Sequence, residues 1–298
     1  MTPEDFDYLR KLLRERSGLV LSAEKQYLAE SRLLPVVRKH KLASLGDLVG
    51  RLKMMPTSPL AIDTVEAMTT NETFFFRDKT PFEHFRDTML PALLVARERE
   101  KRIRIWCAAA STGQEPYSLA MMLKEMALTE KGAALSGVRI DIVATDLAGE
   151  VLERARAGIY SQFEVQRGLP IQLLIKYFQQ SGDAWQIAAD LRAMVQFRTL
   201  NLLNDFTPLG RFDIVYCRNV LIYFDQETKT GVLRRLARQV AGDGYLVLGA
   251  AETVVGLTDA FKPVPDKRGL YAPNAESRDL APAAVAPAMA SAVARRAL

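Results

Sequence analysis

The sequence predicts an α/β protein, with an all-α N-terminal domain followed by an open sheet of mostly parallel strands that carries a small inserted antiparallel β-subdomain. Apolar residues recur at helical spacing over residues 3–53, whereas short apolar runs alternate with helical segments farther along. One stretch between two of these runs interrupts the alternation. We therefore expect a helical domain over residues 1–72, an α/β domain over 73–275 with its insert at about 160–197, and an Ala/Pro-rich, disordered tail over 276–298.

The N-terminal segment has the pattern of amphipathic helices. Its apolar positions fall three or four residues apart, and the pattern breaks at Ser17-Gly18 and again at Ser44. These apolar positions are Phe6, Leu9, Leu12, Leu13, Leu28, Leu33, Leu34, Val37, Leu45, Leu48 and Leu52. We interpret the segment as a small helical domain.

The central segment has the pattern of a parallel sheet. The apolar runs are IRIWCAA, IDIVATD, FDIVYCRNVLIYF and GYLVLGAAE, and the helical segments between them include EPYSLAMMLKEMAL and TKTGVLRRLARQV. Continuous apolar runs of this length are typical of strands buried on both faces. The interrupting stretch, DAWQIAADLRAMVQF, we interpret as short antiparallel strands.

Composition excludes several classes of protein. The 298 residues are 49% hydrophobic and 25% charged, as in ordinary globular proteins. No apolar run approaches the roughly 18 to 20 residues of a membrane span, so we expect a cytoplasmic protein without membrane insertion. The two cysteines, Cys107 and Cys217, lie in apolar runs, which argues against a disulfide framework or a zinc site. A net charge of +5 suits an acidic protein partner better than it indicates nucleic acid.

Polar residues at the ends of the predicted strands form the candidate site, because ligands of open α/β sheets bind beyond the carboxyl ends of the strands. The first strand leads into a loop with one glycine, Gly113, instead of G-x-G-x-x-G, which argues against a nicotinamide dinucleotide. Glu115 would repel a phosphate and attract a cation, as in S-adenosylmethionine. Asp146 ends the second strand, where an acid commonly accepts hydrogen bonds from ribose hydroxyls. Alternatively, Asp146 caps the following helix.

Five motifs together resemble the chemotaxis receptor methyltransferases, the CheR family. These motifs are NETFFFRD, AAASTGQEPYSLAM, ATDLAGEVLERARAGIY, NLL and FDIVYCRNVLIYFD, and the resemblance spans about residues 5–272. It implies a Rossmann-like methyltransferase domain that uses S-adenosylmethionine, releases S-adenosylhomocysteine and requires no metal. It also implies methyl transfer to glutamate side chains of membrane chemoreceptors.

The resemblance assigns cofactor-binding and catalytic roles to residues that match the family motifs. The cofactor positions are Asn71, Thr73, Arg77, Glu115, Asp146, Asn201, Leu202, Arg218 and Asn219, and Arg77 with Tyr223 lies at the reacting end. Two departures are Gln114 before Glu115, where many relatives have two acids, and Gly249-Ala250-Ala251-Glu252, where many have Gly-His-Ser-Glu.

The run of three phenylalanines has a proposed place in this scheme. Phe74, Phe75 and Phe76 would pack at the boundary between the two domains while Thr73 and Arg77 face the cofactor. The alternatives are that the rings are plain core and that Arg77 is a surface charge paired with Asp78.

The same resemblance suggests two partner sites. Six basic residues of the N-terminal domain could dock an acidic receptor helix, or they could form a solvated face. They are Arg32, Arg38, Lys39, Lys41, Arg51 and Lys53. The inserted β-subdomain could add a receptor C-terminal peptide to its edge. A nucleic-acid methyltransferase is disfavoured because no Asn/Asp-Pro-Pro-Tyr/Phe motif is present, and a non-catalytic cofactor sensor because Arg77 and Tyr223 are both retained.

The two cysteines provide a test of strand order. In the usual methyltransferase order, 3-2-1-4-5, the strands of Cys107 and Cys217 are neighbours. Neighbouring strands lie about 4.8 Å apart, which permits a disulfide in the right register. The alternative is two buried thiols in the core of the sheet.

Overall fold

The computed structural model describes residues 1–277, and the tail expected to be disordered lies, apart from its first two residues, outside them. Its N-terminal helices are α1 (Pro3–Ser17), α2 (Gln26–Lys39), α3 (Leu45–Met54) and α4 (Pro59–Met68). The breaks seen in the sequence are real: Gly18 ends α1 with φ of 77°, and the Ser44 side chain caps α3 by accepting from the Asp47 N–H.

The main sheet has the order β6-β2-β1-β7-β8-β10-β9. The first five strands are parallel and correspond to the order 3-2-1-4-5, whereas β10 pairs antiparallel with β8 and with β9. Their bounds are β1 (Arg102–Ala108), β2 (Arg139–Asp146), β6 (Val195–Thr199), β7 (Phe212–Cys217), β8 (Val240–Leu248), β9 (Phe261–Pro263) and β10 (Leu270–Pro273). The antiparallel pair at the edge was not expected from the sequence.

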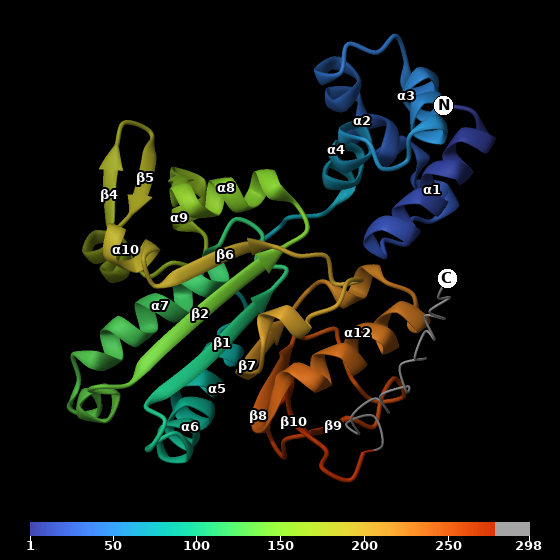
Figure 1. Ribbon diagram of the computed structural model, residues 1–298. Helices are drawn as coiled ribbons and strands as arrows, with labels where there is room; N and C mark the ends of the chain where they lie inside the picture. Colours follow the sequence, from blue (N-terminus) through green and yellow to red (C-terminus); the bar gives the residue numbers. More distant parts are fainter. Residues whose placement is uncertain (278–298) are drawn as a thin grey trace, which may run out of the picture.

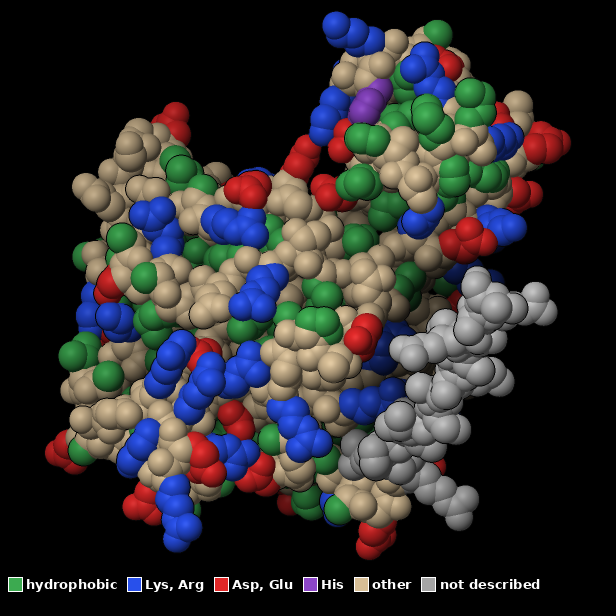
Figure 2. Space-filling model, in the orientation of Figure 1, with side chains coloured by type: hydrophobic (Ala, Val, Ile, Leu, Met, Phe, Trp, Pro, Cys, Tyr) green, Lys and Arg blue, Asp and Glu red, His purple; other side chains and the backbone are tan. Residues whose placement is uncertain are grey.

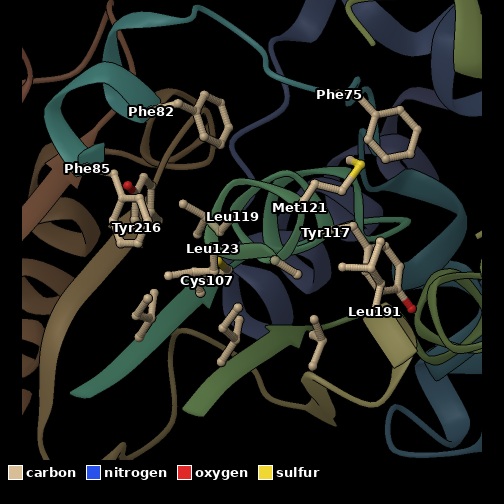
Figure 3. Close-up of a cluster of buried hydrophobic side chains, with 14 of the residues drawn as sticks. Phe75, Phe82, Phe85, Cys107, Tyr117, Leu119, Met121, Leu123, Leu191 and Tyr216 are labelled. Atoms are coloured by element: carbon tan, nitrogen blue, oxygen red, sulfur yellow. The ribbon is translucent and has the colours of Figure 1, made fainter. Parts of the chain in front are cut away.

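Helices cover both faces of this sheet. The helices are α5 (Thr80–His84), α6 (Leu90–Ala96), α7 (Gln114–Ala127), α8 (Gly149–Ala157) and α12 (Gln226–Gln239), with a π turn at Phe85–Met89 and 3-10 turns at Ala23–Lys25, Glu130–Leu135, Thr207–Leu209 and Leu221–Tyr223. One core cluster joins the sheet to α5, α6 and α7, and Figure 3 shows part of it around Cys107 and Tyr117. A second cluster joins the opposite face to α12.

The insert is a three-stranded antiparallel sheet with short helices. Its elements are β3 (Ile159–Ser161), α9 (Gln162–Gln166), α10 (Ile171–Tyr177), β4 (Phe178–Ser181), β5 (Ala184–Ile187) and α11 (Ala189–Arg192), in the sheet order β3-β5-β4. The interpretation of DAWQIAADLRAMVQF as antiparallel strands holds for β5 alone. Ala189–Arg192 is a helical turn of good helix formers, and the next residues join the main sheet as β6.

The phenylalanine run does not pack at the domain boundary, so that expectation was wrong. Phe75 is fully buried and meets Tyr160 and Phe178 of the insert edge to face, with ring centroids 5.1 and 5.5 Å apart. Phe74 and Phe76 are half-buried. The rings therefore fix the insert to the α/β core.

The cysteines lie on neighbouring strands, as expected from the order, but on opposite faces of the sheet. Cys107 pairs with Tyr216, and Ala108 pairs with Cys217, so the two thiols are offset by one residue. Side chains alternate between faces along a strand, and the offset therefore excludes a disulfide. Both cysteines are free and buried, and burial raises the pKa of each thiol.

The two domains meet at the carboxyl ends of the parallel strands, where the arrowheads of β1 and β2 point toward the N-terminal helices (Figure 1). Several bonds cross the junction. The Arg14 guanidinium pairs with Asp225 at 2.7 Å, and the Val20 N–H donates to the Tyr223 carbonyl at 2.9 Å. Within residues 1–277 no helix is long and apolar enough to cross a membrane.

Candidate functional site

A cavity lies at this junction, beyond the ends of β1, β2 and β7. It is lined by every residue that the sequence placed in the site: Asn71, Thr73, Arg77, Glu115, Asp146, Asn201, Leu202, Arg218, Asn219 and Tyr223. The structure thus brings together residues from five separate motifs. Their individual roles stay predictions.

The N-terminal domain supplies part of the wall, which the sequence did not indicate. Ser17 is the last residue of α1 and Leu19 follows it closely, whereas Thr69 and Thr70 directly follow α4. Ser17-Gly18 was interpreted only as a helix break. Because these residues contact the cavity through tertiary packing, no local pattern marks them.

Arg218 is a buried arginine at the centre of a charge cluster, in which Glu115 is half-buried and Asp78 exposed. Its guanidinium lies 2.7 Å from the Glu115 carboxylate and 2.7 Å from that of Asp78, and it also donates to the Arg77 carbonyl at 3.0 Å. The alternative in which Asp78 pairs with Arg77 is therefore wrong. Burial raises the pKa of Glu115, and Arg218 opposes that rise. The cavity lining as a whole has three acids, Glu72, Glu115 and Asp146, against the two arginines Arg77 and Arg218, an excess of acids that suits a cationic ligand.

Asp146 is held by backbone groups on both sides. One carboxylate oxygen accepts from the Ser111 N–H at 2.8 Å and the other from the Ala148 N–H at 3.0 Å. The side chain belongs to a residue only 7% exposed, and burial raises its pKa. Each oxygen retains a lone pair that could accept from a ribose hydroxyl. The bond to Ala148 supports the loop before α8, but the N-cap of that helix is Ala148, so the alternative in which Asp146 caps the helix is wrong.

Arg77 lies beside Phe74 in the loop that carries the phenylalanines. Its guanidinium donates to the Glu72 carbonyl at 2.8 Å and lies 5.6 Å from the centre of the Phe74 ring. Arg167 of the insert lies over the same ring at 4.4 Å and pairs with the Glu72 carboxylate at 2.6 Å. The insert therefore supports the loop that presents Arg77 to the cavity.

Asn201 joins the two domains. Its side-chain amide donates to the Arg16 carbonyl near the end of α1 at 2.6 Å, and its side-chain oxygen accepts from the Leu203 N–H at 2.9 Å. The neighbouring Leu202 is buried and lines the cavity. Asn201 thus borders the cavity while its polar atoms are bonded to the protein.

Glu252 forms a cradle for the loop after β7. Its two carboxylate oxygens accept the backbone N–H groups of Asn219, Val220, Leu221 and Gly249 at 2.7 to 3.0 Å. This acid is the one retained in the Gly249-Ala250-Ala251-Glu252 stretch. It orders the loop that carries Arg218, Asn219 and Tyr223, a role that the sequence did not reveal.

Within residues 1–277, no group of three or more His, Cys, Asp or Glu side chains is arranged to hold a metal ion. The polar residues that line the cavity are instead the acids Glu72, Glu115 and Asp146, two arginines, and residues with amide or hydroxyl groups, with apolar side chains beside them. A parallel sheet of order 3-2-1-4-5 with a cavity beyond the carboxyl ends of its strands defines a Rossmann-like domain.

Comparison with known proteins identifies the family. The family model "CheR methyltransferase, SAM binding domain" matches residues 71–270, and "CheR methyltransferase, all-alpha domain" matches residues 4–57. The chain belongs to the CheR methyltransferase family. The expected N-terminal helical domain and methyltransferase fold are thereby confirmed.

Curated relatives extend over nearly the whole chain. Chemotaxis protein methyltransferase 1 of Pseudomonas aeruginosa is 43% identical over 267 residues, which are 89% of this chain and 96% of that protein. Chemotaxis protein methyltransferase Cher2 of Pseudomonas putida is 40% identical, with the same coverage of both chains. The chemotaxis protein methyltransferase of Escherichia coli is 35% identical and covers 86% of each chain.

Proposed function

We propose that this chain transfers a methyl group from S-adenosyl-L-methionine to glutamate side chains of methyl-accepting chemotaxis receptors in the cytoplasm. The products are glutamate methyl esters and S-adenosyl-L-homocysteine. The observation that carries the proposal is the cavity, in which buried Asp146 at the end of β2 and Glu115 in the first turn of α7 lie together with half-buried Arg77 and Tyr223. Membership in the CheR family and the names of the relatives support it.

The cavity fits such a cofactor by its own chemistry. The excess of acids over arginines in the lining suits the cationic sulfonium and ammonium groups, and Asp146 retains acceptor capacity for ribose hydroxyls. Leu202 offers an apolar surface for adenine, with Asn201 beside it. Asn71, Thr73 and Asn219 would complete the binding surface at the methionine end.

The reaction needs no general base, because a glutamate side chain with an unperturbed pKa of about 4.3 is ionised at pH 7. S-adenosylmethionine supplies a methyl group activated by the positive sulfur. The substrate carboxylate forms a carbon–oxygen bond in line with the carbon–sulfur bond that breaks, and the electrons of that bond remain on sulfur as a neutral thioether. The protein contributes positioning and exclusion of water.

Arg77 and Tyr223 would position the substrate carboxylate. Within residues 1–277, the Tyr223 hydroxyl has no hydrogen-bond partner, and Arg77 uses its guanidinium for one bond to the Glu72 carbonyl. Both groups therefore have donors for a charge-assisted bond to the carboxylate. The attraction must be moderate, because equal stabilisation of ground and transition states would not raise the rate.

An acidic receptor helix is the partner that we propose for the N-terminal domain. Most of the six basic residues are bonded within the chain: Arg32 donates to the Met68 carbonyl, Lys39 pairs with Asp63 and Glu150, Arg51 with Asp47, and Lys53 with Asp5. Arg38 and Lys41 are exposed and have no such partner among the described residues. Figure 2 shows basic, acidic and apolar side chains interleaved on the visible face of this domain. Docking would therefore depend on Arg38 and Lys41.

The insert would supply a second contact. In its sheet, β5 is central, and β3 and β4 are edges. An edge strand has unpaired backbone groups that can pair with an extended peptide, and a receptor C-terminal peptide is the occupant that we propose. The three residues of β4 after Phe178 are exposed.

The test is methyl transfer from labelled S-adenosylmethionine to receptor-containing membranes, with isolated receptor helices and RNA as comparison substrates. We expect label on the receptor that alkali releases as methanol, because esters hydrolyse in alkali whereas methylamines do not. Label on RNA, or alkali-stable label on the receptor, would refute the proposed substrate.

A further inference from the structure

The N-terminus of α8 is completed by the other domain. The residue before the helix, Ala148, has no side chain that can cap it. The first N–H groups of a helix need partners from outside it. The Ala148 N–H donates to Asp146, and the Gly149 N–H donates to a carboxylate oxygen of Glu66 on α4 at 2.9 Å. Glu66 lies 83 residues earlier in the chain and belongs to the N-terminal domain.

The segment that Glu66 fixes is part of the cavity wall. Asp146 and Leu147 immediately precede Ala148, and both line the cavity. Leu147 also packs against the apolar core of the N-terminal domain. The Asp146 carboxylate is oriented by the Ser111 N–H on one side and by the Ala148 N–H on the other, and Ala148 directly precedes the amide that donates to Glu66.

A second contact holds the same turn of α8. Lys39 of α2 reaches Glu150 at 2.9 Å and Asp63 of α4 at 3.0 Å. Both ends of this contact are exposed, so its contribution is small. Glu66 is half-buried and bonds the backbone directly. Its negative charge also lies at the positive end of the α8 dipole.

We propose that Glu66 is a positioning residue for cofactor binding: by capping α8 across the domain junction, it holds Asp146 and Leu147 in the geometry that receives the adenosine part of S-adenosylmethionine. This inference rests on the proposed cofactor site and is independent of the methyl-accepting substrate. If Glu66 acts in this way, cofactor affinity depends on how the N-terminal domain packs against the α/β domain.

The test measures the affinity of the full chain for S-adenosylhomocysteine by calorimetry. Glu66→Ala leaves the half-buried Gly149 N–H without its acceptor, and we expect affinity to fall about tenfold, close to the lower end of the range for a lost hydrogen bond to a charged group. Glu66→Gln keeps an acceptor oxygen and should bind within about threefold of the unsubstituted chain. In a methylation assay, Glu66→Ala should raise the KM for S-adenosylmethionine and leave kcat at saturation nearly unchanged, because Glu66 touches no reacting atom.

Two further variants separate the bond from general damage to α4 or α8. Ile62→Ala changes an exposed side chain one turn earlier on α4 and should not alter affinity. Gly149→Pro removes the donor at a first helical position, which proline tolerates, and should also weaken affinity because the bond to Glu66 is lost. Glu66→Ala should then add no further loss in the Gly149→Pro background.

Three outcomes would overturn the proposal. The first is that a folded Glu66→Ala chain binds S-adenosylhomocysteine within twofold of the unsubstituted chain. The second is that Ile62→Ala loses as much affinity as Glu66→Ala. The third is that Glu66→Ala lowers the unfolding temperature without any change in affinity. If the unsubstituted chain binds S-adenosylhomocysteine but does not methylate receptors, the proposed substrate fails while this inference stands.

Discussion

Glu252→Gln is a nearly isosteric change that should loosen the loop after β7. In the native chain one carboxylate oxygen accepts from Val220 and Leu221, and the other from Asn219 and Gly249. A glutamine at this position has one acceptor oxygen and one NH2 group. In either orientation of the amide, two backbone N–H groups would face another donor.

The magnitude follows from these two lost acceptors. Hydrogen bonds to charged groups contribute about 1.5–3 kcal/mol each, and a buried donor without a partner costs about 1–3 kcal/mol. Relaxation of the loop offsets part of this, so we expect a loss of about 3 kcal/mol in unfolding free energy. For a domain of about 200 residues, 1 kcal/mol corresponds to roughly 2–4 °C, which predicts a Tm lower by about 6–12 °C. Affinity for S-adenosylhomocysteine should fall as well, because the loop carries Arg218 and Asn219.

Thermal and urea unfolding of the full chain would measure the effect, with Glu98→Gln as the matched control. Glu98 is exposed, so the same loss of charge there should leave the Tm unchanged. A Tm for Glu252→Gln within about 2 °C of the original would refute the cradle as a source of stability. A lower Tm with full affinity would show that the cradle stabilises the fold without shaping the cofactor site.

Three other predictions concern the site and docking. Asp146→Ala should weaken S-adenosylhomocysteine binding by roughly 1–3 kcal/mol in calorimetry, and unchanged affinity would remove the ribose assignment. Burial raises the pKa of Asp146, so cofactor affinity should begin to decline at a pH above the ordinary aspartate pKa as the pH is lowered. Stability should change in the opposite direction: the ionised group is disfavoured in the folded state, so lowering the pH through the pKa of Asp146 should stabilise the fold relative to Asp146→Asn. Tyr223→Phe should lower kcat more than cofactor affinity, and Arg77→Ala should lower both; equal losses in Tyr223→Phe would make it a binding residue. The double variant Arg38→Glu, Lys41→Glu should slow methylation of intact receptor without changing cofactor affinity. Raised salt should have the same effect on the unsubstituted chain, and methylation that does not depend on salt would contradict docking by charge.

The sequence was sufficient where a feature depends on local pattern. Continuous apolar runs indicated buried parallel strands, and the polar residues that follow them had to meet at one edge of the sheet. Gly18 and Ser44 marked helix ends because each has a specific local effect on the backbone. Glu115 and Asp146 were therefore found from the strand pattern, whereas Asn71, Asn201 and Asn219 came from the family resemblance, and the structure brings all of them around one cavity.

The sequence was insufficient where a feature depends on register or on pairing between distant segments. A one-residue offset between β1 and β7 decides which face each cysteine occupies, and no residue pattern specifies that offset. The Glu115–Arg218 pair joins residues 103 positions apart, and Asn201 bonds a carbonyl 185 positions away. Such contacts exist only once the domains have packed.

The backbone around the cavity shows how the site keeps its shape. Within residues 1–277, nine non-glycine residues have left-handed φ values, and six of them lie in three loops that border the cavity: Phe76, Asp78, Lys79, Ala109, Ser111 and Asn219. Each such residue costs about 1–3 kcal/mol, so the conformation persists only where other contacts impose it. In every loop one of these strained residues donates its N–H to a buried side chain.

These three acceptors connect strain to the proposed function. Phe76 donates to the Ser118 hydroxyl at 3.0 Å, Ser111 to Asp146 at 2.8 Å and Asn219 to Glu252 at 2.8 Å. The loops are therefore held by groups of the rigid α/β core or its strand ends, and a ligand need not supply the energy of ordering them. Since Asp146 both holds the Ser111 loop and is proposed to bind ribose, its replacement by alanine should disturb the loop as well as the hydrogen bonds to the cofactor. Asp146→Asn keeps one acceptor, so it should retain more affinity than Asp146→Ala, and equal losses would show that the carboxylate charge matters more than the loop.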